Sequence, residues 1–246
     1  MMEARGVSRR FGGLLAVADL SLMLRAGELH AVIGPNGAGK STLVNLLAGA
    51  LAPTDGSIWL NGADVTHLTV ERRARAGIGR TFQRTNPMLE MTVLENVRLA
   101  AQAALVSNWG LLRRADRAQA PIDTARDALR RVGLDGAGGA LARTLSHGQS
   151  RQLEIGMALA GQPHVLLLDE PLAGSGAEDA SPLIALMRDL SREHAVLLVE
   201  HDMDVVFAVA DVITVMVDGR VLACGSPADI RASAAVRDAY LGHVVA

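Results

Sequence analysis

The sequence predicts an α/β fold with a mainly parallel core sheet, an antiparallel β subdomain at its N-terminal end and an α-helical subdomain in the middle. Three observations predict it. A short apolar run, Leu29–Ile33, leads into a glycine-rich loop and then into a helical pattern. From residue 165 to residue 219, short apolar runs alternate with helical patterns, which is typical of parallel strands covered on both faces. Between these parts, residues 86–161 are mostly helical in pattern.

The first third of the chain predicts antiparallel strands around the first strand–helix unit. Residues 14–33 read as two strands joined at "RAGE", because leucines alternate before the turn and an apolar run follows it. Residues 56–65 have strand character on both sides of Asn61-Gly62, a dipeptide that favours a tight hairpin turn.

The loop from Gly34 to Ser41 reads G-P-N-G-A-G-K-S and fits G-x-x-x-x-G-K-[ST] at every fixed position. Its glycines let the backbone turn tightly and bring N–H groups onto phosphate oxygens, and the following helix adds its positive N-terminus. Lys40 is the one lysine of a chain whose other basic residues are arginines. A compact ammonium reaches between the β- and γ-phosphates, whereas the planar fork of arginine does not fit there. The alternative is a glycine-rich turn with a solvated Lys40; the complete match in a strand–helix context argues against it.

The rest of the chain predicts the helical subdomain and then the other strands of the parallel sheet. We expect helices over 92–105, 122–133 and 147–162, strands over 165–170, 195–200 and 212–219, and helices over 179–194 and 203–210. No internal repeat or low-complexity linker divides the sequence, so residues 1–246 are expected to form one domain.

The amino-acid composition and net charge limit the classes of protein to which this chain can belong. Half of the 246 residues are apolar but only 2% are aromatic, so the core must be packed with aliphatic side chains. A formal net charge of −2 gives no support to a nucleic-acid-binding role. The single cysteine, Cys224, excludes an internal disulfide and predicts a buried structural thiol. There is no signal peptide and no long apolar run, which predicts a soluble, cytoplasmic chain.

Two carboxylates follow the apolar strand "HVLLL". Asp169 at the strand end is placed to bind Mg²⁺, directly or through water, together with the hydroxyl of Ser41. Glu170 comes next and, on an extended chain, points to the other side, where it can act on an attacking water. The alternative is a strand that ends in two solvated carboxylates. The phosphate loop elsewhere in the chain favours the catalytic interpretation.

The segment "TLSHGQS" permits two compatible interpretations. Ser146 and Gln149 form S-x-x-Q, a capping box that starts a helix. A serine and backbone N–H groups at an exposed helix N-terminus also form an anion site, and Gly148 allows a close approach. Because the phosphate loop already serves one nucleotide, a second anion site points to a second copy of the chain.

With these motifs in order, the chain resembles the ATP-binding cassette (ABC) ATPases over nearly all of its length. Gly34–Ser41 looks like the Walker A loop, the strand ending in Asp169-Glu170 like Walker B, and "LSHGQ" like the signature motif. Gln83 in "RTFQ" matches the Q-loop of the family, and His201 in "VEHDM" matches its switch histidine. The resemblance implies a P-loop NTPase fold, the cofactors ATP and Mg²⁺, and a head-to-tail dimer in which each ATP lies between two chains.

The resemblance also implies the roles of individual residues. The ATP-binding residues are Phe11, Gly34, Pro35, Asn36, Gly37, Ala38, Gly39, Lys40, Ser41, Thr42 and, toward the partner's ATP, Ser146, His147, Gly148 and Gln149. The catalytic residues are Glu170, His201, Lys40 and Gln83, and the metal ligands are Ser41, Gln83 and Asp169.

Three positions depart from the usual pattern of the family. His147 stands where glycine is more usual. Phe11 replaces the commoner tyrosine that stacks on adenine; a plain apolar hairpin residue is the alternative. Where the family commonly reads S-A-L-D after the catalytic glutamate, residues 173–176 read A-G-S-G, so signalling between the two sites falls to backbone or to Ser175.

The closer resemblance is to importer ATPases for branched-chain amino acids, carried by "RRFGGLLAV", "GIGRTFQRTNPMLEMTVLENV", "LSHGQSRQLEIGMALA" and "AYLG". ATPases of urea importers share "LSHGQ", "LEIGM" and "VEHDM" and compete with them; an exporter ATPase of the lipopolysaccharide type is a further alternative. The implied partners are membrane permease subunits, a second ATPase subunit (this chain or a homologous one) and, indirectly, a solute-binding protein, with the chain peripheral on the inner face of the cell membrane. Met88, Leu89 and Met91 are candidates for permease docking, although core packing is as good an interpretation. The arginines of "ERRARAGIGRTFQR" are expected to form a solvated face.

Overall fold

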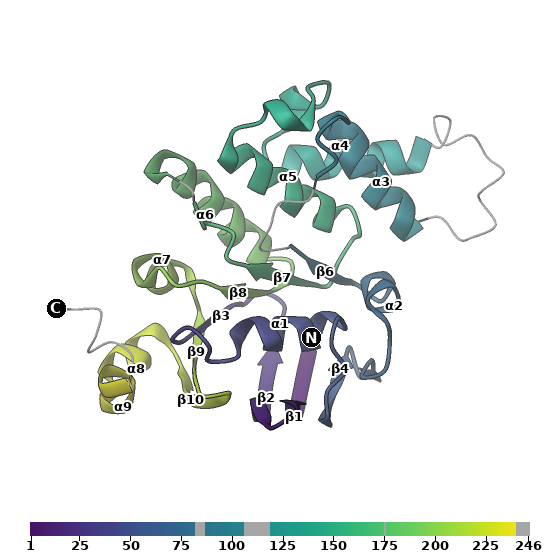
Figure 1. Ribbon diagram of the computed structural model, residues 1–246. Helices are drawn as coiled ribbons and strands as arrows, with labels where there is room; N and C mark the ends of the chain where they lie inside the picture. Colours follow the sequence, from purple (N-terminus) through teal and green to yellow (C-terminus); the bar gives the residue numbers. More distant parts are fainter. Residues whose placement is uncertain (82–86, 106–118, 175, 240–246) are drawn as a thin grey trace.

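The computed structural model describes residues 1–81, 87–105, 119–174 and 176–239, arranged as two sheets with helices between and around them (Figure 1). The larger sheet has the order β10-β9-β3-β8-β7-β6. Its strands are β3 (Leu29–Ile33), β6 (Ile78–Arg80), β7 (Val165–Asp169), β8 (Ala195–Val199), β9 (Val212–Val217) and β10 (Arg220–Gly225). All neighbours pair in parallel except β9 and β10, so the predicted mainly parallel core sheet is confirmed.

The smaller sheet is antiparallel and has the order β2-β1-β4-β5. Its strands are β1 (Met2–Phe11), β2 (Leu14–Leu24), β4 (Asp55–Leu60) and β5 (Ala63–Asp64). Asn61 and Gly62 have φ of 49° and 83°, as the predicted hairpin turn requires. β1 lies at the centre of this sheet although the sequence did not predict it, because its register shifts break the regular alternation of apolar and polar residues.

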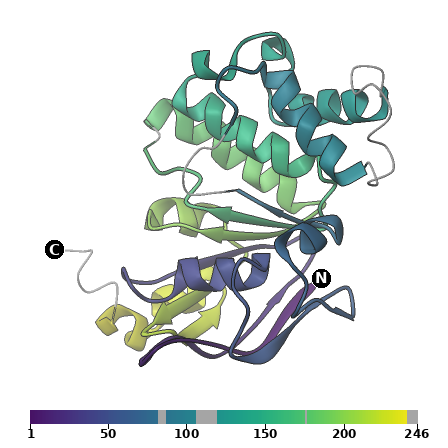
Figure 2. The same cartoon turned by 45° about the vertical axis from the view of Figure 1, so that its right-hand side comes forward.

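The helices lie on both sides of the parallel sheet (Figures 1 and 2). They are α1 (Lys40–Ala48), α2 (Val70–Arg75), α3 (Val93–Leu105), α4 (Gln119–Arg131), α5 (His147–Leu159), α6 (Ala177–Ser191), α7 (Met203–Val209), α8 (Pro227–Ala232) and α9 (Ala234–Ala239), with short 3₁₀ turns at Asp135–Ala137 and Ala142–Thr144. α1 runs between the two sheets, whereas α3, α4 and α5 pack together on the other side. Among the described residues, no helix is both long enough and apolar enough to cross a bilayer.

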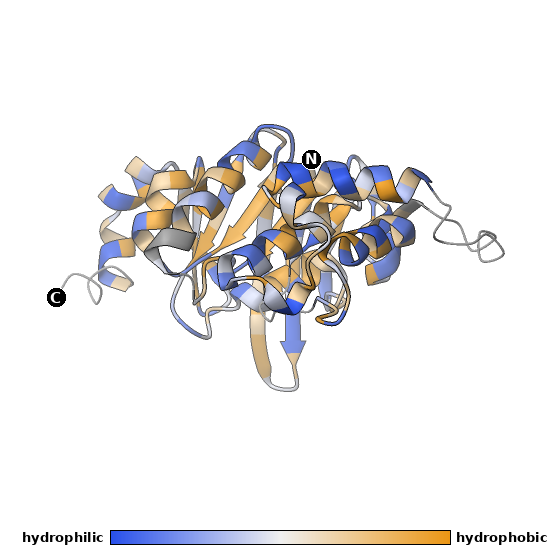
Figure 3. Cartoon of the chain, turned by 90° about the horizontal axis from the view of Figure 1, so that it is seen from above, coloured by the Kyte–Doolittle hydropathy of each residue, from blue (hydrophilic) through white to orange (hydrophobic). Residues whose placement is uncertain are grey.

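Alternate side chains of the parallel strands enter two separate cores. In β7, Leu166 and Leu168 pack with α3–α6, while Val165 and Leu167 pack with α1 and the antiparallel sheet. The central strands β3, β7, β8 and β9 are accordingly apolar along most of their length (Figure 3). β7 ends at Asp169, the first of the two carboxylates predicted to act on ATP.

The structure contradicts the expectations for Arg73 and Cys224. Arg73 is only 1% exposed, so it does not belong to a solvated face; its guanidinium donates to the carbonyls of Leu46, Leu47 and Thr66 at 2.7–2.8 Å and thereby caps the C-terminal end of α1. Cys224 is exposed rather than buried, because it lies in β10 at the edge of the parallel sheet.

Candidate functional site

The phosphate loop joins β3 to α1, and two of its glycines are required by close backbone contacts. A Cβ on Gly34 (φ +150°) would lie 2.0 Å from the carbonyl oxygen of Met216 in β9. A Cβ on Gly39 (φ +98°), which immediately precedes α1, would lie 2.3 Å from the carbonyl oxygen of Ala16 in β2. The loop is therefore held between a strand of each sheet, which fixes where the N-terminal end of α1 points.

Lys40 is the first residue of α1, and its side chain turns back over the loop. Its ammonium donates to the carbonyls of Gly34 at 2.6 Å and Pro35 at 3.0 Å. Burial lowers the pKa of Lys40, while the nearby carboxylates of Glu170 and Asp169 raise it. The two hydrogen bonds hold the end of the Lys40 side chain against the backbone of the loop.

A cavity of about 580 Å³ opens beside this loop, a volume within the usual range for small-molecule sites. Its lining comes from the end of β1 and the start of β2, from the phosphate loop and α1, and from the turns after β7 and β9. It includes Phe11, Leu14, Ala16, Asn36, Gly37, Ala38, Gly39, Lys40, Ser41, Thr42, Glu170, Asp218 and Gly219. The structure thus brings together most of the residues predicted to bind ATP. Gly34 and Pro35 belong to the loop but are not among the lining residues; their carbonyls accept hydrogen bonds from Lys40.

Phe11, the last residue of β1, lines the cavity and is 42% exposed. The guanidinium of Arg9 stacks over its ring at 4.6 Å from the centroid, and Arg9 is itself held by a hydrogen bond of 2.8 Å to the carbonyl of Ala52. A cation on one face of an aromatic ring is a favourable contact that also limits the motion of the ring.

Asp169 ends β7 and is 2% exposed. Burial raises the pKa of its carboxyl group, and the charge of Arg80 opposes that shift. Its Oδ2 lies 3.6 Å from Nη2 of Arg80, while Oδ1 is buried without a hydrogen-bond partner among the described residues. A buried carboxylate oxygen without a partner is costly, so it fits a site for a cation. Together with the Ser41 hydroxyl in the adjoining cavity, it offers the hard oxygen ligands that Mg²⁺ prefers.

Glu170 reaches the cavity for a different reason from the one the sequence suggests. The residue is not extended: its φ is 50°, in the left-handed region, and its N–H donates to the carbonyl of Val199 in β8 at 2.9 Å. The turn at Glu170, rather than the alternation of a strand, directs its side chain into the cavity that contains Lys40. A non-glycine residue in this conformation is uncommon and concentrates at functional sites.

The segment Ser146–Gln149 is the N-terminal end of α5 and forms the predicted capping box. Ser146 Oγ accepts from the N–H of Gln149 at 3.2 Å, and Gln149 Oε1 accepts from the N–H of Ser146 at 3.0 Å. Ser146, His147 and Gln149 are exposed, whereas Gly148 is buried. None of them is among the described residues that line the cavity of the phosphate loop.

His201 follows β8 and is exposed, with Glu200 buried beside it at 1% exposure. Glu200 Oε1 accepts from the N–H of Leu172 at 2.9 Å, and its Oε2 accepts from the N–H of His201 at 3.2 Å. Burial raises the pKa of Glu200. Glu200 thus links the backbone of His201 to the turn after Glu170. Sequence reasoning missed this role, although an acidic residue at the end of an apolar strand was a visible signal.

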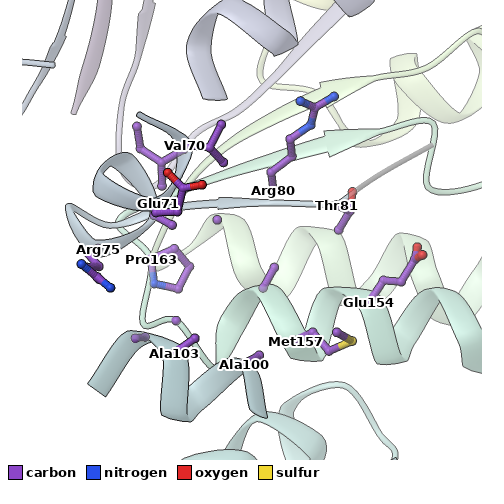
Figure 4. Close-up of a pocket in the computed structure, with 16 residues that line it drawn as sticks. Val70, Glu71, Arg75, Arg80, Thr81, Ala100, Ala103, Glu154, Met157 and Pro163 are labelled. Atoms are coloured by element: carbon purple, nitrogen blue, oxygen red, sulfur yellow. The ribbon is translucent and has the colours of Figure 1, made fainter. Parts of the chain in front are cut away.

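Gln83 and the candidate docking residues Met88, Leu89 and Met91 follow β6 in the chain. Gln83 lies outside the described residues. Met88, Leu89 and Met91 are 52%, 54% and 39% exposed, which excludes core packing for these three side chains. A second cavity, of about 540 Å³ and largely apolar, lies between α2 and β6 on one side and α3 and α5 on the other (Figure 4). Arg80, expected at a solvated face, instead lies at this junction with its guanidinium toward Asp169.

The sequence and the structure were compared with known proteins. A family model described as "ABC transporter" matches residues 17–173, and one described as "Branched-chain amino acid ATP-binding cassette transporter" matches residues 220–246. The chain is 41% identical to the high-affinity branched-chain amino acid transport ATP-binding protein LivG of Salmonella typhimurium, over 98% of each chain. It is 40% identical to the corresponding protein BraF of Pseudomonas aeruginosa, again over 98% of each.

Solved structures of ATP-binding cassettes also superpose on this chain. A nucleotide-free ATP-binding cassette from an ABC transporter superposes with a TM-score of 0.87 at 28% identity, over 98% of each chain. The ADP conformation of an ATP-binding cassette superposes with a TM-score of 0.84 at 27% identity, over 98% of each chain.

Proposed function

The chain belongs to the ATP-binding cassette family of transporter ATPases, and from this premise we propose that it drives a membrane importer for branched-chain amino acids or related small polar solutes. The observation that carries the proposal is the identity of 40–41% along the whole chain with two subunits of branched-chain amino acid transport. The match of residues 220–246 to a family of the same transport class supports it independently. Residues 1–246 then form one ATPase domain, of which residues 86–161 are the helical part.

ATP lies in the cavity of the phosphate loop. Lys40 and the backbone of residues 34–42 hold the phosphates, and the free face of Phe11 receives the adenine. Asp169 and Ser41, with Gln83, hold Mg²⁺, which when bound neutralises charge on the phosphate oxygens. Glu170 takes a proton from the attacking water, and His201 is the switch residue. The support for these roles is that Phe11, Lys40, Ser41 and Glu170 line one cavity and that Asp169 Oδ1 has no protein partner among the described residues.

A second ATPase chain completes the site. Within one chain, Ser146, His147 and Gln149 are exposed and do not line the cavity that holds Lys40. A helix N-terminus of this kind binds anions well, so it is the natural contact for the γ-phosphate held by a partner chain. The partner is a second copy or a homologous subunit, in a head-to-tail pair.

Permease subunits dock at the cavity between α2, β6, α3 and α5, and hold the protein at the inner face of the membrane. The apolar lining, with Ala100, Ala103 and Met157 on one side and Ile78 on the other, suits the side chains of an amphipathic helix (Figure 4). The exposed side chains of Met88, Leu89 and Met91, which precede α3, offer the permease a further apolar contact.

The test is reconstitution with the candidate membrane subunits and solute-binding protein in lipid vesicles. ATP hydrolysis should rise when leucine, isoleucine or valine is added, and Gln83→Ala should bind ATP normally yet lose this stimulation. Stimulation by urea or short amides alone would reassign the solute, and export of a lipid substrate would contradict the direction of transport.

A further inference from the structure

Arg80 connects three parts of the nucleotide-binding half of the molecule. It is the last residue of β6, and its side chain is only 13% exposed. Nη1 donates to Oδ1 of Asn45 in α1 at 2.7 Å, and Nη2 lies 3.6 Å from Oδ2 of Asp169 at the end of β7. In Figure 4 the side chain leaves β6 on the side opposite to Glu154 and Met157, so it reaches toward the nucleotide side of the sheet.

The guanidinium of Arg80 faces one carboxylate oxygen of Asp169 and not the other. Oδ2 faces Arg80, whereas Oδ1 is buried without a hydrogen-bond partner among the described residues. Besides Arg80, the charged groups near this carboxylate are Glu170 and Lys40. The ammonium of Lys40 is directed to the carbonyls of Gly34 and Pro35, whereas the guanidinium of Arg80 faces Oδ2 of Asp169.

We propose that Arg80 is a positioning residue for the magnesium site: it holds Oδ2 of Asp169 so that Oδ1 is presented to the metal. Partners that hydrogen-bond to a metal-ligating carboxylate fix its orientation, and their loss typically costs metal affinity. The planar fork suits this task because one guanidinium spans Asn45 and Asp169 together, which the point charge of lysine does not do. The inference rests on the proposed function, since it requires that Asp169 binds Mg²⁺.

The direction in which metal affinity changes when Arg80 is removed distinguishes a positioning role from a purely electrostatic one. If Arg80 only placed a positive charge near the site, its removal would favour a divalent cation, because a competing cation would be gone. If Arg80 positions Asp169, its removal weakens the metal site despite that electrostatic gain. The two roles therefore predict opposite changes.

The experiment measures the affinity for a non-hydrolysable ATP analogue in EDTA and in Mn²⁺, and takes the ratio as the gain due to the metal. In Arg80→Met we expect this gain to fall by about 10-fold or more, a loss typical of outer-shell partners of a metal, while the affinity in EDTA changes by less than about threefold. The electron paramagnetic resonance spectrum of bound Mn²⁺ should also change. Arg80→Lys should restore only part of the gain.

Arg72→Met is the matched control, because Arg72 lies in α2 and is exposed. A folded Arg80→Met protein with an unchanged or larger gain from Mn²⁺ would overturn the inference. If Arg80→Met does not fold, Asn45→Ala decides, since it keeps both charges and releases only the guanidinium: a reduced gain supports the inference, and an unchanged gain contradicts it. A wild-type chain that binds no nucleotide in EDTA or gains nothing from Mn²⁺ would instead contradict the proposed function.

Discussion

Nε2 of His147 and the main-chain oxygen of Ala173 lie 2.9 Å apart, in a hydrogen bond between the N-terminal end of α5 and the turn after Glu170. A carbonyl oxygen only accepts, so Nε2 carries the proton. The contact is to the backbone of Ala173, three residues before Gly176, the position where the family resemblance leads one to expect an aspartate. A Cβ on the neighbouring Gly174 would lie 3.3 Å from the same nitrogen, so the ring also packs against this turn.

His147→Phe should slow ATP hydrolysis without weakening ATP binding by the isolated chain. Phenylalanine keeps the packing but lacks the donor, and a hydrogen bond of this kind is worth about 1 kcal/mol, which corresponds to a loss of about fivefold in kcat. Binding is preserved because His147 does not line the nucleotide cavity of its own chain. His67→Phe, at another exposed histidine, is the control. Equal kcat values for the two variants would contradict the role of the contact.

Arg73→Met should lower the free energy of unfolding by about 2–4 kcal/mol, because three buried carbonyls lose a charged donor and the side chain volume is poorly replaced. Arg72→Met should change it by less than about 0.5 kcal/mol, as is usual at exposed positions. Urea denaturation of both variants measures the difference. Similar stabilities would mean that Arg73 does not cap α1 in solution.

The strands around the site could be predicted because they are buried on both faces. "LHAVI", "VLLLD" and "AVLLV" are nearly continuous apolar runs with clear ends, and the residues after such ends meet at one edge of a parallel sheet. The phosphate loop is equally local, since its glycines and Lys40 follow one another in the chain. Sequence reasoning could therefore predict that Lys40, Asp169 and Glu170 come close together, as they do in the structure.

What could not be predicted depends on partners far away in the sequence. Arg73 and Arg80 look like members of a solvated basic stretch until their partners, the end of α1 and Asp169, are known. Glu200 has no visible role until Leu172 is placed beside it. The conformation of Glu170 follows from its hydrogen bond to Val199, which belongs to a neighbouring strand.

Lys40→Ala should abolish hydrolysis and severely weaken ATP binding, because it removes the positive side chain at the phosphate loop. Lys40→Arg should fail as well, since the guanidinium is too large for the space between the carbonyls of Gly34 and Pro35 and the phosphates. Fluorescent ATP binding and phosphate release measure the two effects. Near-normal turnover in the arginine variant would refute the explanation given for the one lysine of the chain.

Glu200→Gln should flatten the pH dependence of stability. Burial raises the pKa of Glu200 above its ordinary value of 4.5, so the folded protein binds this proton more tightly than the unfolded chain does. The stabilising effect of the protonated group is fully present below the unfolded pKa and is lost as pH rises through the folded pKa. The variant cannot lose that proton, so its unfolding free energy relative to wild type should increase as pH rises from 4.5. Urea denaturation at a series of pH values should show this, and parallel profiles would contradict it.

The composite nucleotide site can be tested by mixing two defective chains. Lys40→Ala removes the cation of the cavity, and Ser146→Arg places bulk and charge at the exposed end of α5, where the partner's γ-phosphate is proposed to lie. In a head-to-tail heterodimer of these chains, one site carries both defects and the other carries neither. Mixtures should therefore recover part of the ATPase activity that each variant lacks alone, provided that one intact site suffices. If the natural partner is a homologous chain, the same mixing is done in its presence.

Glu170→Gln gives an independent measurement of the same pairing. The substitution keeps the shape of the side chain and removes the base, which is typically worth about 10²- to 10⁴-fold in rate. ATP then stays bound, and the closed pair should accumulate as a dimer by light scattering, whereas adding Ser146→Arg to the same chain should leave it monomeric. The two substitutions lie in different parts of the fold, one in the cavity and one at α5, so an effect of Ser146 on a dimer that Glu170→Gln stabilises requires contact between chains. A Glu170→Gln chain that remains monomeric with ATP, alone and with every candidate partner, would contradict the composite site.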